Sequence, residues 1–301
     1  MSGREARLPA QAKVNLYLRI LAREASGYHQ IETIFLRLAL ADEVVVRTGV
    51  GGRTVDCHGA DVGPMELNLA YRAAMALRDA GGPDTFAIEI EKRIPVGAGL
   101  GGGSADAAAV LRALNALSDS PLPDDQLLGL AATLGADVPF LTSGAVMALA
   151  WGRGERMLVL EPPPSRTVVL LVPPFAISTA EAYAWLDADL RQPASVPRPR
   201  IWRSDDLSGW PALSAIAHND FEHLVAARHP EIDELASDLR AAGASSALMS
   251  GSGSAVFGIF SAGLPATDAA LQRSAGLMQT ESAVASPWRI EGTYSPTRRS
   301  T

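Results

Sequence analysis

The chain has 301 residues, of which 48% are hydrophobic and 20% are charged, a balance that predicts a packed globular core. Its length suits one large or two medium-sized domains. The net charge of −7 lacks the basic excess typical of nucleic-acid-binding proteins, and a single cysteine excludes an internal disulfide framework or a thiol-rich metal site.

The N-terminal ten residues carry charges but no apolar stretch of the kind found in secretory signals. No apolar run reaches the roughly 20 residues that a membrane helix needs. We therefore expect a soluble, cytoplasmic protein with neither a nucleic-acid nor a membrane partner, either a monomer or a homodimer. The cysteine, Cys57, precedes His58 and can be read as a nucleophile, but no activating group is visible, so a buried or incidental cysteine is favoured.

The first ninety residues predict strands around one helix. In chain order the expected elements are strands at 12–20, 34–40 and 43–47, a helix at 68–80 and a strand at 85–90. Ala41 and Asp42 are expected to form a turn between the second and third strands. Asn68 is a suitable N-cap for the helix, and the glycine pair after Ala80 is a natural stop.

The next segment begins with a glycine-rich loop and then predicts helices before strands. The expected elements are helices at 104–117 and 124–134, followed by a strand pair at 145–150 and 156–160. Gly135 would end the second helix.

Three consecutive prolines at 162–164 predict a domain boundary, because proline continues neither a helix nor a central strand. We place an N-terminal domain at residues 1–160 and a C-terminal domain at residues 161–301. In the second domain we expect a strand at 168–172, a loop at 193–200, helices at 220–227 and 231–242, strands at 247–249 and 255–260, and a frayed tail at 294–301. Strands and helices mix without strict alternation, which predicts an α+β fold.

The glycine-rich loop PVGAGLGGGS, residues 95–104, lies between a predicted strand and a predicted helix. Glycine permits positive φ and removes the Cβ that would keep a phosphate away from the backbone. The first N–H groups of the helix lack intrahelical partners, and the helix dipole adds partial positive charge there. The loop therefore predicts an anion site, in which Ser104 caps the helix or donates its hydroxyl to a phosphate or magnesium.

Other interpretations of this loop remain. It is not the P-loop of common NTPases, because no lysine precedes Ser104. Gly97, Gly99 and Gly102 match the dinucleotide-binding spacing GxGxxG, but no clear βαβ unit surrounds them. A flexible hinge or a tight turn is the purely structural alternative.

The loop resembles the phosphate loop of the GHMP kinases, and four other segments match that family in the same order. They are PAQAKVNLYL at 9–18, GYHQIETIF at 27–35, LGADVPFLTSG at 134–144 and MSGSGSAVFGIF at 249–260. The GLGGGS form of the loop and the GYH segment resemble one branch in particular. The resemblance covers residues 9 to 260.

The resemblance implies a two-domain GHMP kinase fold with ATP and substrate in the cleft between domains, and ATP bound mainly by the N-terminal one. In the branch it points to, the γ-phosphate of ATP moves to the 2-hydroxyl of 4-diphosphocytidyl-2-C-methyl-D-erythritol, giving ADP and the 2-phosphate, in the non-mevalonate isoprenoid pathway. Magnesium would arrive with ATP, since no His/Asp/Glu cluster has metal-ligand spacing.

The resemblance also implies roles for single residues. Asp137 would be the catalytic base and Lys13 its charged partner, while Asn15, Tyr28 and His29 would bind the substrate, the last two at its cytosine end. The implied ATP loop consists of Pro95, Val96, Gly97, Ala98, Gly99, Leu100, Gly101, Gly102, Gly103, Ser104 and Ala105.

Each of these residues also has a structural interpretation. Asp137 alone can be a turn or N-cap aspartate. Lys13 lies in an apolar strand, where its charge needs a partner such as Asp137 or an escape to solvent. Tyr28 and His29 suit a pyrimidine by stacking and hydrogen bonding, but they also suit a turn with a partly buried pair.

Two further polar segments have both a functional and a structural interpretation. The choice stays open for the first, and the structural interpretation is favoured for the second. The GSGS segment at 251–254 can bring backbone N–H groups to phosphates, or it can be a hairpin turn. His218, Asn219 and Asp220 look like a metal triad, but we interpret Asn219 or Asp220 as a helix cap.

Three competing functions follow. A GHMP kinase for another alcohol, such as mevalonate or homoserine, is disfavoured by the GYH segment and the GLGGGS loop. A non-catalytic nucleotide-binding protein of the same fold is disfavoured by the presence of both Lys13 and Asp137. A dinucleotide oxidoreductase is disfavoured by the late position of the loop.

Overall fold

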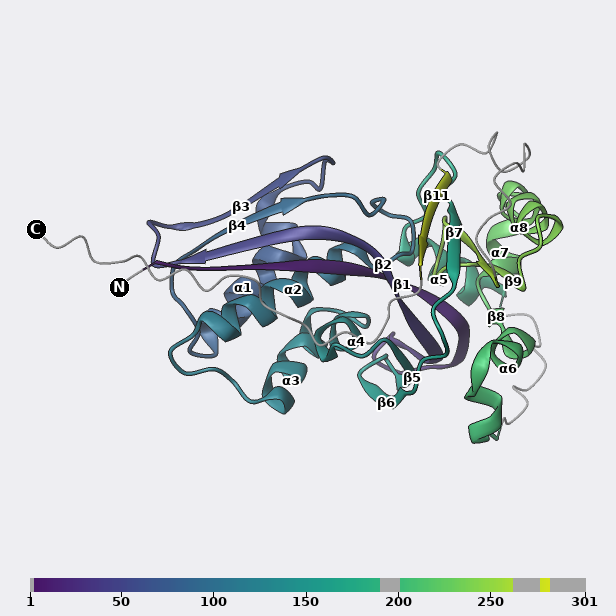
Figure 1. The fold of residues 1–301 in the computed structure, drawn as a ribbon, viewed down its shortest axis with the longest axis horizontal. Coiled ribbons are helices and arrows are strands. Elements are labelled where there is room, and N and C mark those ends of the chain that lie inside the picture. The colour runs from purple at the N-terminus through teal and green to yellow at the C-terminus, as the bar shows by residue number, and fades with distance from the viewer. Residues whose placement is uncertain (1–2, 190–200, 262–276, 282–301) are drawn as a thin grey trace, which may run out of the picture.

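The computed structural model describes residues 3–189, 201–261 and 277–281, and these form two β-sheets with their covering helices (Figure 1). The loop expected at 193–200 and the tail expected at 294–301 lie outside the described residues. In the described part, no helix combines the length and apolar character needed to cross a membrane.

The larger sheet has seven strands among the described residues. They are β1 (Arg4–Arg23), β2 (His29–Thr48), β3 (Arg53–His58), β4 (Phe86–Glu91), β5 (Met147–Gly152), β6 (Arg156–Leu160) and β8 (His218–Asn219). Their order is β3-β4-β2-β1-β8, and β5 pairs with β2 while β6 pairs with β5. Neighbours are antiparallel except in the pairs β3–β4 and β1–β8.

The smaller sheet has four antiparallel strands among the described residues. They are β7 (Thr167–Leu171), β9 (Ser246–Met249), β10 (Val256–Phe260) and β11 (Leu277–Glu281), in the order β11-β7-β10-β9. The prolines at 162–164 lie between β6 of the larger sheet and β7 of the smaller one.

Helices pack against both sheets. They are α1 (Leu69–Asp79), α2 (Gly102–Leu117), α3 (Asp124–Leu134), α4 (Val138–Ser143), α5 (Thr179–Asp189), α6 (Gly209–Ile216), α7 (Glu222–Ala226) and α8 (Glu231–Ala241), with short 3-10 turns at Met65–Leu67 and Ser204–Leu207. The α2 helix lies at the centre of the larger layer, in contact with β1, β2, α1 and α4, whereas α8 covers β9 and β10. The mixture confirms the α+β class.

The α2 helix can occupy this central place because its side chains are small. Its buried residues include Ala105, Ala107, Ala108, Ala109 and Ala113, which let the helix approach the sheet closely. The apolar side chains of β1 and β2 complete this core. A second cluster, formed by the smaller sheet, α5, α7 and α8, packs on the other side of the junction.

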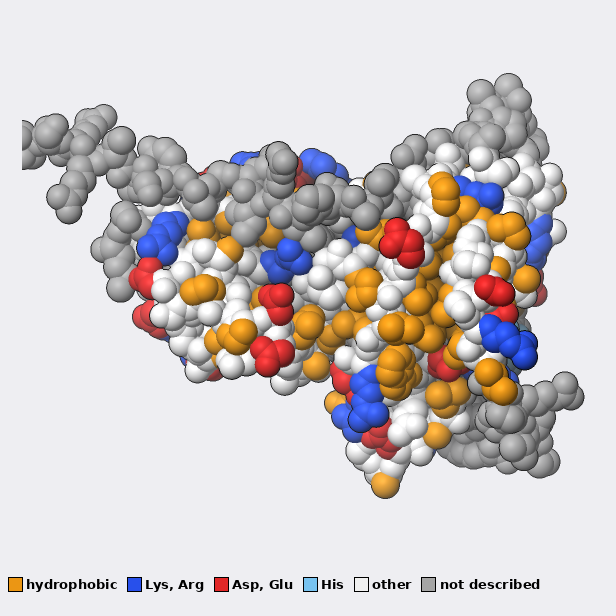
Figure 2. Space-filling model, turned by 60° about the horizontal axis from the view of Figure 1, so that its bottom comes forward, with side chains coloured by type: hydrophobic (Ala, Val, Ile, Leu, Met, Phe, Trp, Pro, Cys, Tyr) orange, Lys and Arg blue, Asp and Glu red, His pale blue; other side chains and the backbone are white. Residues whose placement is uncertain are grey.

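The face shown in Figure 2 reflects this division. Hydrophobic side chains gather there in a band between the left and right parts of the molecule, where the two sheets meet.

Every helix and strand expected from the sequence overlaps an observed one, but the turn at Ala41 and Asp42 is wrong. The two strands expected there are one strand, β2, which pairs with β1 through Ala41 and Asp42. Asp42 is buried, and its carboxylate accepts the backbone N–H groups of Arg93 and Ile94 at 2.6 and 2.8 Å. A polar residue typical of turns is therefore satisfied inside the sheet by a segment fifty residues away.

Helix α4, which was not anticipated, is fixed by a buried arginine of β2. Arg37 is about 1% exposed and donates to the carbonyl oxygens of Phe140, Leu141 and Ala145 at 3.0, 3.2 and 2.8 Å. Burial, with a smaller contribution from the charge of Arg112, lowers the pKa of Arg37 to about 9, so the guanidinium remains charged at neutral pH. Carbonyl dipoles at the C-terminal end of α4 thus stabilise a buried cation.

We predict that Arg37→Met lowers the free energy of unfolding by about 3 kcal/mol, because it leaves several buried carbonyls without a donor. The matched control is Arg7→Met in the neighbouring strand, where an exposed ion pair with Glu43 is lost and the change should stay within about 1 kcal/mol. Urea denaturation measures both. Equal losses in the two variants would contradict the role given to Arg37.

Candidate active site

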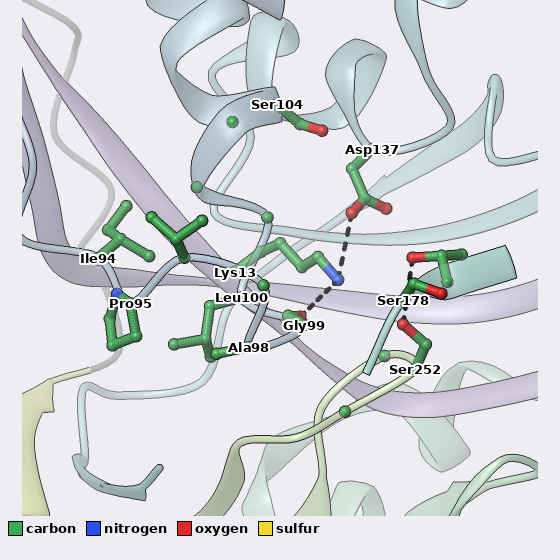
Figure 3. Close-up of a pocket in the computed structure, with 18 of the residues that line it drawn as sticks. Lys13, Ile94, Pro95, Ala98, Gly99, Leu100, Ser104, Asp137, Ser178 and Ser252 are labelled. Atoms are coloured by element: carbon green, nitrogen blue, oxygen red, sulfur yellow. Dashed lines mark hydrogen bonds and ion pairs between the residues drawn. The ribbon is translucent and has the colours of Figure 1, made fainter. Parts of the chain in front are cut away.

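The glycine-rich loop, β1 and the segment before α4 enclose a cavity of about 570 Å³. All ten residues of the loop 95–104 line it, as do Lys13, Asn15 and Asp137 (Figure 3). The 251–253 part of the GSGS segment lines the same cavity. Residues from four distant parts of the sequence therefore meet at one site.

The loop enters α2 through backbone conformations that require glycine. Gly97, Gly99 and Gly101 have φ values of 72°, 75° and 73°, and Gly101 is the N-cap of α2. A Cβ at Gly99 would collide with the carbonyl oxygen of Ser250, and a Cβ at Gly101 would lie 3.0 Å from two side-chain carbons of Lys13. The helix begins at Gly102, two residues earlier than expected, so its free N–H groups open directly onto the cavity.

Lys13 is the buried cation of the site, with a side chain only 4% exposed. Its Nζ donates to Asn15 Oδ1 at 2.8 Å and to the carbonyl oxygen of Gly99 at 3.1 Å, and it lies 3.2 Å from Asp137 Oδ2. Two hydrogen-bond acceptors and one ion-pair partner therefore surround the ammonium. The alternative in which Lys13 reaches out to solvent is therefore wrong.

Asp137 occupies the N-cap position of α4, with Pro139 in the first turn of that helix. Its side chain makes no capping hydrogen bond and is 26% exposed. Figure 3 shows Asp137 and Lys13 pointing toward each other across the cavity. A carboxylate that is free of helix capping, held by a lysine and open to the cavity is suited to accept a proton from a bound hydroxyl.

The GSGS segment is both a hairpin connection and a wall of the cavity. It joins the antiparallel strands β9 and β10. The hydroxyl of Ser250 donates to the carbonyl oxygen of Gly99 at 3.0 Å, and the N–H of Ala255 donates to that of Ala98 at 3.1 Å. The connection is thus fastened to the glycine-rich loop from the side of the smaller sheet.

The beginning of α5 adds residues that sequence reasoning missed. Ser178, Thr179 and Tyr183 line the cavity, and Thr179 shares a hydroxyl hydrogen bond of 3.2 Å with Ser252. Burial, with a contribution from the charge of Asp137, raises the pKa of Tyr183 to about 12, so its hydroxyl stays neutral. A serine with a glutamate three residues later, Ser178 and Glu181, was the available signal, because it is a capping box at a helix start.

Tyr28 and His29 lie apart from the lining of this cavity. Tyr28 is 60% exposed, and the guanidinium of Arg153 lies 4.1 Å from its ring centre. His29 is buried, bonds to Asp187 at 2.8 Å and stacks on Tyr183 with ring centres 4.5 Å apart. Tyr183 connects His29 to the cavity, because its ring stacks on His29 and Tyr183 is one of the lining residues.

A second buried lysine, Lys92, lines the same cavity beside the glycine-rich loop. Lys92 contacts the carboxylates of Asp42 and Asp106, with 2.7 Å to Asp106, and all three side chains are at most 4% exposed. Burial raises the pKa of Asp106 to about 7, against the opposing charge of Lys92 and with a further rise from Asp42. Among the described residues, Asp106 Oδ1 has no hydrogen-bond partner. Asp106, an acidic residue among the alanines in the first turns of α2, was the signal that sequence reasoning passed over.

The remaining polar candidates have structural roles. The N-cap of α7 is Phe221 and not Asn219 or Asp220 as predicted, although Asn219 Oδ1 accepts the N–H of Phe221 at 3.0 Å. Cys57 is half-buried and accepts a hydrogen bond from Asn68, and burial raises the pKa of its thiol, which disfavours a nucleophile. The described part of the chain contains no group of three His, Cys, Asp or Glu side chains suited to a metal.

Comparison with known proteins identifies two family matches along the chain. Residues 68–150 match the domain described as "GHMP kinases N terminal domain", and residues 206–273 match "GHMP kinases C terminal". The two matches lie on either side of the 162–164 prolines.

Whole-length relatives agree with these matches. The 4-diphosphocytidyl-2-C-methyl-D-erythritol kinase of Pelotomaculum thermopropionicum is 42% identical over 252 residues, which cover 83% of this chain and 87% of that protein. The kinase of the same name from Geobacter sp. (strain M21) is 42% identical over 259 residues, or 85% and 90% of the two chains. A crystal structure of 4-(cytidine 5'-diphospho)-2C-methyl-D-erythritol kinase has a TM-score of 0.69 at 35% identity, covering 91% of this chain and 98% of the other.

The buried carboxylate of Asp106 predicts a pH dependence of stability. Because the folded chain holds the Asp106 proton up to about pH 7 and the unfolded chain releases it near pH 4, this group makes the free energy of unfolding fall as pH rises between those values. Asp106→Asn cannot ionise. Between pH 5 and pH 8, the free energy of unfolding of Asp106→Asn should therefore rise by about 1 kcal/mol or more relative to that of the unchanged protein.

Denaturant unfolding at several pH values measures this difference. The control is Asp125→Asn in the exposed first turn of α3, which should leave the shape of the profile unchanged. A parallel profile for Asp106→Asn and the unchanged protein would show that Asp106 is ionised in the folded state throughout this range.

Proposed function

The chain belongs to the GHMP kinase family, and we propose how its residues carry out the reaction of the 4-diphosphocytidyl-2-C-methyl-D-erythritol kinases. This ATP-dependent reaction phosphorylates the 2-hydroxyl of 4-diphosphocytidyl-2-C-methyl-D-erythritol, giving the 2-phosphate and ADP, in the non-mevalonate isoprenoid pathway. The observation that carries the assignment to this site is the ion pair of Lys13 and Asp137 at the glycine-rich loop. A carboxylate next to a cation at an anion-binding loop supports the transfer of a phosphate to an alcohol at this site.

The loop 95–104 holds the phosphates of ATP in this proposal. The start of α2 offers N–H groups and a positive dipole end, and glycine leaves room for phosphate oxygens against the backbone. Ala105 differs from the rest of the implied loop, because its N–H already donates to the carbonyl oxygen of Gly101 at 2.8 Å. Its part is to fix the first turn of the helix.

Asp137 acts as the base and Lys13 as its partner. The substrate 2-hydroxyl approaches Asp137, gives its proton to the carboxylate and forms the new bond to the γ-phosphorus, while the bond from that phosphorus to the leaving ADP oxygen breaks. Lys13 pairs with the carboxylate of Asp137 and brings positive charge beside the moving phosphoryl group. Phosphoryl transfer depends mainly on such alignment and charge neutralisation.

Magnesium fits this site as an ion that comes with the nucleotide. The hydroxyl of Ser104 and the carboxylate of Asp137 are oxygen ligands of the type that magnesium prefers, and both residues line the cavity. The described residues hold no cluster of three metal-binding side chains, so phosphate oxygens would supply most ligands. The ion would neutralise charge on the phosphates.

The substrate lies between Asp137 and the GYH segment in this proposal. Asn15 lines the cavity beside Lys13 and contacts the acceptor end. Tyr28 and His29 bind the cytosine end, which is supported by the exposed ring of Tyr28 and by the contact of His29 with the cavity residue Tyr183. The separation of these two groups of residues suits a long substrate with a nucleotide at one end.

We further propose that residues 1–160 form the N-terminal, ATP-binding domain and residues 161–301 the C-terminal domain. The change from the larger to the smaller sheet after β6 supports this division, although β8 returns to the larger sheet. We place the enzyme in the cytoplasm, where ATP is supplied, as a monomer or homodimer.

A substrate panel tests the function. We expect the purified protein with magnesium and ATP to release ADP when 4-diphosphocytidyl-2-C-methyl-D-erythritol is present, and not with mevalonate or homoserine. Coupled detection of ADP measures turnover. ADP release with mevalonate or homoserine would favour the kinase of another alcohol, and none with any acceptor would favour a non-catalytic nucleotide-binding protein.

The base assignment has its own test in Asp137→Asn. The amide cannot accept the hydroxyl proton, so we expect kcat to fall by about 10²- to 10⁴-fold. Lys13 keeps Asn15 and Gly99 as partners, so the fold should persist. The control is Asp119→Asn, an exposed carboxylate paired with Arg4, which should leave kcat unchanged. A kcat for Asp137→Asn within threefold of the unchanged enzyme would overturn the role.

A further inference from the structure

Asn219 has a place in the fold that neither a cap nor a metal triad explains. It lies in the two-residue strand β8, next to Leu18 of β1, and it is about 4% exposed. A buried amide must satisfy its donors and its acceptor within the protein. The partners of Asn219 therefore show what it holds.

The amide group of Asn219 is directed at the connection between β9 and β10. Its Nδ2 donates to the carbonyl oxygens of Met249 and Gly251, each at 2.8 Å, and its Oδ1 accepts the N–H of Phe221 at 3.0 Å. Both N–H groups of one planar amide are thus used on backbone that leads into the cavity wall. This fixes the carbonyls on either side of Ser250.

Ser250 transmits that placement to the glycine-rich loop. Its hydroxyl donates to the carbonyl oxygen of Gly99 at 3.0 Å, and Lys13 Nζ donates to the same oxygen at 3.1 Å. Gly251 also lies near the Lys13 ammonium, since a Cβ added at Gly251 would be 3.3 Å from Lys13 Nζ. A shift of the connection would therefore move an acceptor of Lys13 and the space around its ammonium.

We propose that Asn219 is a positioning residue for the phosphoryl transfer. It acts through the 249–251 backbone and the Gly99 carbonyl to set where Lys13 holds Asp137. The inference rests on the proposed function of that ion pair, and it adds a residue that contacts neither of its members. Because α2 is held by its own packing against the larger sheet, the phosphate-binding N–H groups do not depend on Asn219.

The chemistry requires an amide at this position. In Asn219→Asp the side chain keeps its shape but loses both donors, and a carboxylate then faces two carbonyl oxygens. A misplacement of about 1 Å in a catalytic group can cost about 10²-fold in rate. We therefore expect kcat to fall by about 10- to 100-fold, with KM values for ATP and substrate within about threefold of the unchanged enzyme.

The neighbour Asp220 gives a matched control. Its carboxylate accepts the N–H of Ile20 at 2.7 Å and bonds to His218 at 2.6 Å, so it ties β8 to β1 without contacting the connection. Asp220→Asn should lower the melting temperature and leave kcat unchanged. A purely structural role for Asn219 would make the two variants behave alike.

The experiment measures kcat, both KM values and the melting temperature for the unchanged enzyme, Asn219→Asp and Asp220→Asn. Asn219→Ser, which retains one donor, should fall between the unchanged enzyme and Asn219→Asp in kcat, and it decides the same question if Asn219→Asp does not fold. The proposal is overturned if the soluble Asn219 variants keep full kcat, or if their loss lies entirely in KM. Turnover by the unchanged enzyme on its cytidyl substrate separates that outcome from a failure of the proposed function.

Discussion

The site depends on how one buried ammonium is satisfied. Lys13 lies in an apolar strand, where an unpaired charge would be very costly, and its Nζ has two hydrogen-bond acceptors and one ion-pair partner. One partner is the carbonyl of Gly99, and another is the carboxylate of Asp137. The stem of the lysine fills the space that a Cβ at Gly101 would need. The position of the Lys13 side chain and the need for glycine in the loop therefore constrain each other.

That constraint extends across the junction of the two sheets. Lys13 belongs to β1 of the larger sheet, whereas Ser250 belongs to the connection of the smaller sheet, and the carbonyl of Gly99 accepts from both. One of the acceptors that hold Lys13 is therefore fixed from both layers. Coupling of this kind favours a rigid site over one assembled from mobile loops, because phosphoryl transfer gains most from fixed alignment.

Local patterns predicted most elements, and long-range contacts explain the failures. Asn68 caps α1 as expected, because capping depends on residues only two positions away. Asp42 looked like a turn residue, but Lys92 and the backbone after it satisfy that carboxylate from fifty residues away. Lys13 and Asp137 were found because their segments resemble a family pattern. Asn219 was misassigned because its partners, Met249 and Gly251, are about thirty residues further along the chain.

The charge balance of the site follows from which cations are already neutralised. Lys92 is near the loop but is matched by two carboxylates, so it adds little net positive potential there. In a chain with a net charge of −7, the proposed phosphate binding then relies mainly on the start of α2, because Lys13 is itself paired with Asp137. The start of α2 at Gly102 matters for this reason, because Ala105 already bonds within the helix and only the N–H groups of the preceding residues are left for phosphate.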